Sequence, residues 1–389
     1  MPIALVLSVL VLQILLIFTH LAVYAVAAAA FGIGGLLFKT IFVVLAFTFL
    51  SASLLAHAYK GKFFDWYYAA AAYWFGLVSF LFGGAVAFFF IAKVLYSFNY
   101  YVSPALLAGV LFGFSFFLHL YGTWKSGRAE ITRIDIAMPG LPEAWRTKKI
   151  VFVSDFHLGK VWRREFTEKV AGKIRALAPH AVFIGGDLYD GVACDLKDVI
   201  EPLRSLRPPH GVYFITGNHE YFLSDIAPAL AAIRNVGIRI LEDERVDIDG
   251  ISVIGVSDKS DKDTAHREDH FRKILNLKRL KTRNHEEKHF EKRLNGTGAQ
   301  GDQPTILLKH EPDYLEIANE AGIALGLFGH THHGQIFPLN YLTWRIYHGF
   351  DYGLHRVGNM QTYTSSGVGT WGPPLRLNTK SEIVLITLR

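Results

Sequence analysis

The chain has 389 residues, of which 51% are hydrophobic and 30 are phenylalanine, and its formal net charge is +6. The single cysteine, Cys194, excludes an intrachain disulfide and a zinc site made of thiolates. Nearly all of the hydrophobic excess lies before Trp124, which separates an apolar N-terminal third from a C-terminal part of mixed composition.

Four long apolar runs make up the N-terminal third. They are residues 3–30, 41–58, 66–92 and 104–122. A helix of roughly 20 apolar residues crosses the hydrocarbon layer of a membrane. Residues 1–124 are therefore predicted to form an all-α transmembrane domain of about four helices. Because the first run is long, Gly32–Gly35 is predicted to form a turn after it.

The basic residues that flank these runs predict the orientation. The second connecting loop holds Lys60 and Lys62, and the exit from the fourth run holds Lys125, Arg128 and Arg133, whereas the other two loops hold one lysine each. The side richer in Lys and Arg is expected to be cytoplasmic. We therefore expect a multi-pass protein of the inner (cytoplasmic) membrane, with both termini and the C-terminal part in the cytoplasm.

Three histidines, His20, His57 and His119, lie within the apolar runs. A buried polar relay is one interpretation, and it would accompany a transporter. None of the four runs contains an acidic residue to pair with them. We therefore prefer neutral histidines that are paired with backbone carbonyls or lie near the membrane interface.

Residues 125–148 are predicted to be a polar linker that includes an edge strand at 133–137. From Lys149 onward, short apolar runs alternate with polar helical stretches. The predicted strands are 150–154, 181–185, 212–216, 251–256, 305–309, 323–328, 361–365 and 383–388, and the predicted helices are 163–177, 195–206 and 224–235. This alternation predicts a layered α/β domain over residues 149–389.

A charged insertion at residues 258–303 interrupts that rhythm. Six apolar residues in it are spaced to give a helix or two an apolar stripe: Phe271, Ile274, Leu275, Leu280, Phe290 and Leu294. We interpret the insertion as a solvated excursion, in preference to a basic amphipathic helix that lies on anionic lipid. Its four histidines are interpreted as surface residues because they lie outside every strand end: His266, His270, His285 and His289.

Five segments repeat one pattern, in which an apolar strand is followed by side chains that bind metals. They read Asp155-Phe-His157, Gly185-Gly-Asp-Leu-Tyr-Asp190, Gly217-Asn-His-Glu220, Lys309-His310-Glu311 and Gly329-His-Thr-His-His-Gly-Gln335. In an open α/β sheet, functional groups gather beyond the carboxyl ends of the strands. The candidate ligands are Asp155, His157, Asp187, Asn218, His310, His330 and His332.

These seven donors are more than one ion needs, which predicts two divalent ions that share one carboxylate. All of the donors are oxygen or imidazole nitrogen. Such a set suits manganese, iron or zinc, and it argues against copper(I) or thiolate chemistry.

In these five blocks, in this order, the chain resembles the calcineurin-like metallophosphoesterases over about residues 148–389. Its ending, Tyr363–Arg376 followed by Glu382–Leu388, resembles the bacterial YkuE/YaeI-type branch, which includes membrane-associated enzymes. Some relatives of that branch cleave the lipid A precursor UDP-diacylglucosamine. The resemblance implies a four-layer α/β/β/α sandwich after the transmembrane bundle.

The resemblance also implies the role of each ligand. One metal would be held by Asp155, His157 and His332, the other by Asn218, His310 and His330, with Asp187 bridging the two ions. A hydroxide held between the metals would attack phosphorus in line with the leaving oxygen.

Five further residues receive roles beside the ligands. His219 is predicted to protonate the leaving group or to hold a phosphate oxygen, and Glu220 and Asp190 are predicted to orient ligands. His333 stands where the family commonly has glycine, and it is either a substrate contact or a tolerated loop residue. Arg376 either contacts a substrate phosphate or makes a structural salt bridge.

Three functions follow from the whole sequence. The first is a membrane-anchored phosphoesterase acting on a phosphodiester or pyrophosphate, with the lipid bilayer and a lipid-linked substrate as partners. The second is the same chemistry on a soluble nucleotide, with the helices as a plain anchor. The third is a membrane sensor or transporter with a regulatory metal-binding domain. No nucleic-acid partner is expected.

Overall fold

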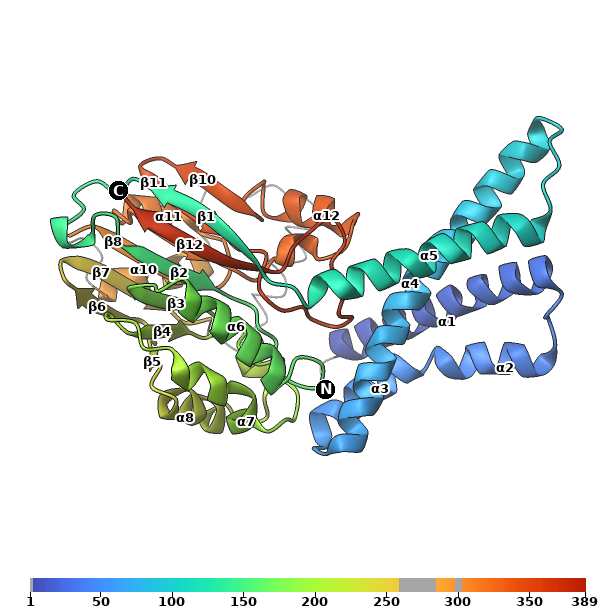
Figure 1. Cartoon of the computed structure of the whole chain (residues 1–389), viewed down its shortest axis with the longest axis horizontal. Coiled ribbons are helices and arrows are strands. Elements are labelled where there is room, and N and C mark those ends of the chain that lie inside the picture. The colour runs from blue at the N-terminus through green and yellow to red at the C-terminus, as the bar shows by residue number, and fades with distance from the viewer. Residues whose placement is uncertain (1–2, 259–284, 298–302) are drawn as a thin grey trace. The chain divides into compact units, whose positions relative to one another are not determined.

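The structure is a computed structural model that describes residues 3–258, 285–297 and 303–389. The chain divides into two compact units (Figure 1). Unit 1 consists of Met1–Lys125 together with Gly372–Leu375, and unit 2 consists of Ser126–Trp371 together with Arg376–Arg389. The segment that was predicted to be a linker therefore belongs largely to unit 2, where it supplies the first strand.

Unit 1 is helical. Its helices are α1 (Ile3–Phe31), α2 (Leu36–Leu45), α3 (Thr48–Ala58), α4 (Lys62–Ser97) and α5 (Pro104–Ser126). Among the described residues they make four helices, with α2 and α3 counted as one, that are long and apolar enough to cross a membrane. The predicted second helix is broken at Ala46 and Phe47, between α2 and α3. The turn predicted at Gly32–Gly35 is present, and Gly32 has a φ of 69° there.

Two of the three histidines in unit 1 are paired with main-chain carbonyls. Nδ1 of His20 lies 2.7 Å from the Leu16 carbonyl oxygen, and Nδ1 of His57 lies 2.7 Å from that of Ser53. These bonds confirm the preferred interpretation for both rings. His119 differs, because its buried Nδ1 has no hydrogen-bond partner in the part of the chain that the structure describes.

Unit 2 is built on two six-stranded sheets. The first has the order β1 (Glu130–Ile136), β12 (Glu382–Leu388), β2 (Lys149–Val153), β3 (Ala181–Gly185), β4 (Val212–Ile215) and β5 (Arg239–Ile240). The second has the order β10 (Gly353–Val357), β11 (Met360–Thr364), β9 (Leu325–Phe328), β8 (Thr305–Lys309), β7 (Ile251–Val256) and β6 (Glu244–Ile248). Strands β2–β5 are parallel to one another, as are β7, β8, β9 and β11.

The two sheets pack face to face through fully buried apolar side chains. Phe152 and Phe183 of the first sheet share one core with Leu308 and Leu327 of the second. The outer face of the first sheet packs on α6 (Arg164–Ala176), α7 (Leu196–Ile200) and α8 (Ala227–Asn235). The outer face of the second packs on α10 (His285–Gly296) and α11 (Leu315–Glu320). This order of layers confirms the predicted α/β/β/α sandwich.

Several elements were not predicted from the sequence: β5, β6, β10, α11 and α12 (Leu339–Ile346). The solvated interpretation of the insertion is wrong for residues 285–297. Phe290 and Leu294 of α10 are buried in the core of the second sheet, and Arg293 forms an ion pair with Asp243. The predicted surface histidines His266 and His270 lie outside the described residues.

Candidate metal centre

Every candidate ligand follows the carboxyl end of a parallel strand. Asp155 and His157 follow β2, Asp187 follows β3, and Asn218 follows β4 in the first sheet. The remaining ligands come from the second sheet, where His310 follows β8 and both His330 and His332 follow β9. Because β2, β3 and β4 are neighbours and β8 and β9 are neighbours, the loops meet at one edge of the sandwich.

The backbone at these ligands is held in an unusual conformation. Five of the seven have a positive φ although none is glycine, and these are Asp155 (56°), His157 (50°), Asp187 (50°), His330 (70°) and His332 (50°). A non-glycine residue in this region costs on the order of 1 kcal/mol or more, and such residues cluster at functional sites. The backbone preferences of Asp and His therefore do not explain these positive φ angles. We attribute them to the convergence of the side chains on one site.

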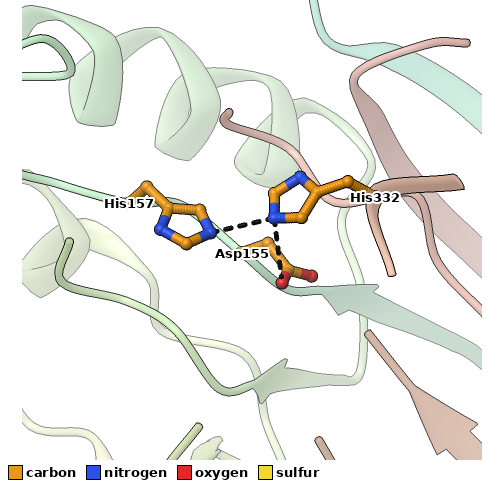
Figure 2. Close-up of side chains that lie close together, drawn as sticks. All are labelled: Asp155, His157 and His332. Atoms are coloured by element: carbon orange, nitrogen blue, oxygen red, sulfur yellow. Dashed lines mark hydrogen bonds and ion pairs between the residues drawn. The ribbon is translucent and has the colours of Figure 1, made fainter. Parts of the chain in front are cut away.

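One group consists of Asp155, His157 and His332, whose ligand atoms lie within 4.8 Å of one another. Nε2 of His157 is 2.9 Å from Nε2 of His332, which in turn is 3.4 Å from Oδ1 of Asp155 (Figure 2). Nδ1 of His157 lies 3.1 Å from Oδ1 of Asp190, and this contact orients the ring. A carboxylate behind an imidazole is the usual support for a metal-binding histidine.

A second group consists of Asp187, His310 and His330. Oδ2 of Asp187 lies 3.0 Å from Nε2 of His310, and Nδ1 of His330 lies 2.9 Å from the amide oxygen of Asn218. Nδ1 of His310 lies 2.7 Å from the Gly185 carbonyl oxygen, and this bond directs buried Nε2 toward Asp187. An imidazole nitrogen held in this way beside a carboxylate is a suitable metal ligand.

Asp187 connects the two groups. Its oxygens also lie within ligand distance of His157 and His219, in a third cluster. The sequence assigned the same division of ligands, with Asp187 between them, and that assignment stays a prediction. A metal ligand is a further alternative for His219, which was predicted to contact substrate rather than metal.

The pKa values of the site residues shift in opposite directions. Burial alone lowers the pKa of His310, but Asp187 and Asp155 outweigh it and raise that pKa well above the ordinary 6.5. The pKa of His332 falls well below 6.5, because burial, His157 and Arg376 all disfavour its charged form. The pKa of Asp187 is lowered, because His310 and His219 outweigh its burial. Carboxylates and imidazoles together form a donor set that suits divalent cations, and binding of a cation would displace the proton of His310.

Glu220 holds the loops that carry two of the ligands. Its Oε2 accepts the backbone N–H groups of Gly217 at 2.7 Å and Asp187 at 3.1 Å, and its Oε1 accepts that of Tyr189 at 3.0 Å. Burial and the nearby Asp187 carboxylate raise its pKa to about 8. The Glu220 side chain thus holds the loops after β3 and β4 against each other, which agrees with the orienting role predicted for it.

Arg376 is fully buried beside His332. Its Nη1 donates to the His332 carbonyl at 2.9 Å, and its Nη2 donates to the carbonyls of Ser366 and Gly369 at 2.6 Å each. Burial lowers the pKa of Arg376 to about 10, so the side chain stays cationic at neutral pH. The geometry favours a structural role over a substrate contact, with main-chain carbonyls as partners.

His333 adopts a left-handed conformation, with φ 49° and ψ 40°. Its Nδ1 lies 2.9 Å from Oδ2 of Asp351, and its ring lies 4.6 Å from that of Tyr352. The side chain is 25% exposed. These contacts fix the ring against Asp351 and Tyr352 and leave part of it accessible to a substrate.

The sequence did not identify the contribution of the loop at Ser366–Gly369. The N–H of Gly369 donates to the Asp155 carbonyl at 2.8 Å, and that of Val368 donates to the Ser154 carbonyl at 2.9 Å. The loop thus supports the turn that carries Asp155. Its Ser-Ser-Gly-Val-Gly sequence was noted only as part of a resemblance, because its partners are distant in the chain.

Comparisons with known proteins identify the family of this chain. Residues 148–334 match the family model described as calcineurin-like phosphoesterase. The chain is 31% identical over 283 residues to a transmembrane protein with metallophosphoesterase domain from Danio rerio, an alignment that covers 70% of this chain and 60% of the relative. It therefore spans less than two thirds of that relative's length.

Two bacterial relatives are covered more fully. A metallophosphoesterase of Aquifex aeolicus is 32% identical over 246 residues, which is 62% of this chain and 85% of the relative. The metallophosphoesterase YkuE of Bacillus subtilis is 27% identical over 290 residues, which is 73% of this chain and 92% of the relative.

Metal content tests the division of the ligands. The protein is expected to hold two divalent ions per chain, His332→Ala about one, and Asp187→Asn the fewest, because Asp187 lies in two of the clusters. Inductively coupled plasma mass spectrometry on protein purified with manganese measures this. His355→Ala is the control, because this histidine lies in β10 and contacts the Tyr352 carbonyl. Equal metal content in all four proteins would contradict the assignment.

Gly217→Ala tests the close packing of the loops. A Cβ at this glycine would lie 2.2 Å from Oδ1 of Asp187, so the carboxylate must move. We expect a loss of about 1–3 kcal/mol in stability, as for other overpacked sites, and weaker manganese binding. Gly172→Ala in α6 is the control, because its Cβ would meet only Arg175 at 3.9 Å. Thermal melting with and without manganese measures both effects, and unchanged manganese stabilisation in Gly217→Ala would refute this packing argument.

Proposed function

This chain belongs to the calcineurin-like metallophosphoesterases and is a metal-dependent phosphoric ester hydrolase, and we propose that it cleaves a phosphodiester or pyrophosphate bond in a lipid or lipid-linked substrate. The observation that carries the proposal is the complete ligand set in unit 2, joined in one chain to four helices that are apolar enough to span a membrane.

In this proposal Asp155, His157 and His332 hold one divalent ion, and Asn218, His310 and His330 hold a second, with Asp187 between them. When bound, two such ions lower the pKa of a water to near neutrality and stabilise negative charge on the phosphoryl oxygens. The donor types favour manganese, iron or zinc.

His219 is the residue proposed to meet the substrate. Its side chain is 19% exposed, whereas those of His157 and His310 are 1% and 0% exposed. Its Nδ1 lies 3.2 Å from the Asp190 carbonyl oxygen, so Nδ1 carries the proton and Nε2 is left for other contacts. Burial lowers its pKa, which favours the neutral ring. From this position His219 would hold a phosphoryl oxygen or pass a proton to the leaving group.

The membrane helices favour a substrate that is itself in the bilayer. In this proposal the membrane is the inner (cytoplasmic) membrane and the catalytic unit lies in the cytoplasm, which the distribution of basic residues around unit 1 supports. A soluble nucleotide with the helices as an anchor is the second candidate. A sensor that only binds is the third candidate, and the clustered His and Asp side chains support hydrolysis in preference to it.

The substrate class is tested by comparing rates in detergent with manganese. The paired substrates are a UDP-linked diacylglucosamine and the UDP-glucosamine headgroup without acyl chains. We expect the intact lipid to be hydrolysed at least tenfold faster, as judged by kcat/KM. Equal values would favour the soluble-nucleotide alternative. Asp187→Asn is the inactive control, and activity that survives this change would count against hydrolysis at this site.

His219→Ala tests the substrate-facing role. We expect kcat to fall by about a hundred- to ten-thousand-fold, as for the loss of general acid assistance, while the metal content stays that of the parent. Steady-state kinetics with an alkyl phosphodiester, whose leaving alkoxide must take up a proton, and metal analysis of the same samples measure this. Loss of metal in this variant would instead make His219 a ligand.

A further inference from the structure

Helix α12 presents a large apolar surface beside the metal centre. It begins seven residues after His332, and none of its residues is buried. Its outward residues include Tyr341 at 63% exposure, Leu342 at 48% and Trp344 at 60%. We use the name α12 face for these exposed side chains with their neighbours: Phe337, Leu339, Tyr341, Leu342, Trp344 and Trp371.

The inner side of α12 is held by polar contacts. The hydroxyl of Thr343 donates to Oδ2 of Asp351 at 3.0 Å, and the same carboxylate oxygen lies 2.9 Å from Nδ1 of His333. Immediately after the helix, the hydroxyl of Tyr347 donates to Glu311, the neighbour of ligand His310, at 3.1 Å. The usual pattern of a surface helix is therefore reversed, with polar groups inward and apolar groups outward.

The start of the helix is attached to the last ligand loop. A Cβ at Gly334 would lie 2.4 Å from the Asn340 backbone nitrogen, so the loop and the helix are in close contact. The side chain of Gln335 accepts the Trp371 N–H at 3.2 Å and donates to the Trp371 carbonyl at 3.1 Å. The α12 face is thus fixed to the loops that carry His310, His330 and His332.

The composition of the α12 face indicates what covers it. Contiguous apolar surface on a soluble protein marks an interaction site, and tryptophan and tyrosine together with leucine and a basic residue are typical of helices that lie in the membrane interface. Exposed Arg345 supplies the basic residue. The same chain carries four candidate membrane spans, and Trp371 is followed directly by Gly372–Leu375 of unit 1.

We propose that the α12 face docks into the interfacial layer of the membrane that holds unit 1, and that the metal centre takes its phosphoester from the headgroups there. The proposal rests on the proposed function, and it adds the surface by which a lipid substrate is reached. Because His333, Glu311 and Gln335 fix this face to the ligand loops, docking would hold the site at the level of the headgroups.

The test uses full-length protein in a Cys194→Ala background, reconstituted into vesicles of phosphatidylcholine and phosphatidylglycerol. An environment-sensitive fluorophore is attached at Leu342→Cys, or at Trp344→Cys if the first variant expresses poorly. Lys169→Cys on α6 is the matched control, because this residue is exposed on a polar helix surface. Quenching by brominated phosphatidylcholine is compared with quenching by aqueous iodide.

We expect brominated lipid to quench the label on α12 at least threefold more than the control label, and iodide to show the reverse order. Equal iodide quenching at both positions would overturn the proposal. Protection from iodide without quenching by brominated lipid would also overturn it, and would identify a second copy or a protein partner on this face. The readout needs no turnover, so it can fail while hydrolysis stands, and a protein without activity can still pass it.

Discussion

The centre of unit 2 depends on one electrostatic constraint, which is that buried carboxylates and imidazoles converge on one small volume. Nε2 of His157 and Nε2 of His332 lie 2.9 Å apart, and Nδ1 of His157 is directed to Asp190. Nε2 of His310 lies 3.0 Å from Asp187, and its Nδ1 is bonded to the Gly185 carbonyl. Bound cations resolve such an arrangement, and neutral packing does not.

That constraint accounts for the less ordinary features of the surrounding backbone. Ligands at the ends of parallel strands reach a common point only where the chain turns sharply, and five of them do so with a positive φ. Glu220 and Arg376 offset that cost by bonding main-chain groups of the ligand loops. The close approach of the loops also requires glycine at Gly217, where a side chain would displace Asp187.

Much of this could be predicted from the sequence, and the reasons for the failures are physical. The strands that carry ligands are continuous apolar runs, so the sequence predicts where they end. The ligand motifs at those ends predicted the family, and the comparisons confirm it. Strand β5 has two residues, and β10 depends on pairing with β11. Helix α12 was missed because its apolar residues face outward. Phe290 and Leu294 are buried by contacts with Tyr314 and the second sheet. These partners are distant in the chain, and the charged residues around Phe290 and Leu294 predict exposure instead.

Two features of one chain connect the proposed hydrolytic centre with a membrane, the four apolar helices and the outward-facing α12. The chemistry proposed for this centre requires that two cations share Asp187. Electron paramagnetic resonance of the manganese-loaded protein tests this most directly. We predict the spectrum of an exchange-coupled manganese pair, which loss of Asp187 converts to that of isolated ions. A fully loaded parent protein that gives only the spectrum of isolated manganese would contradict the account.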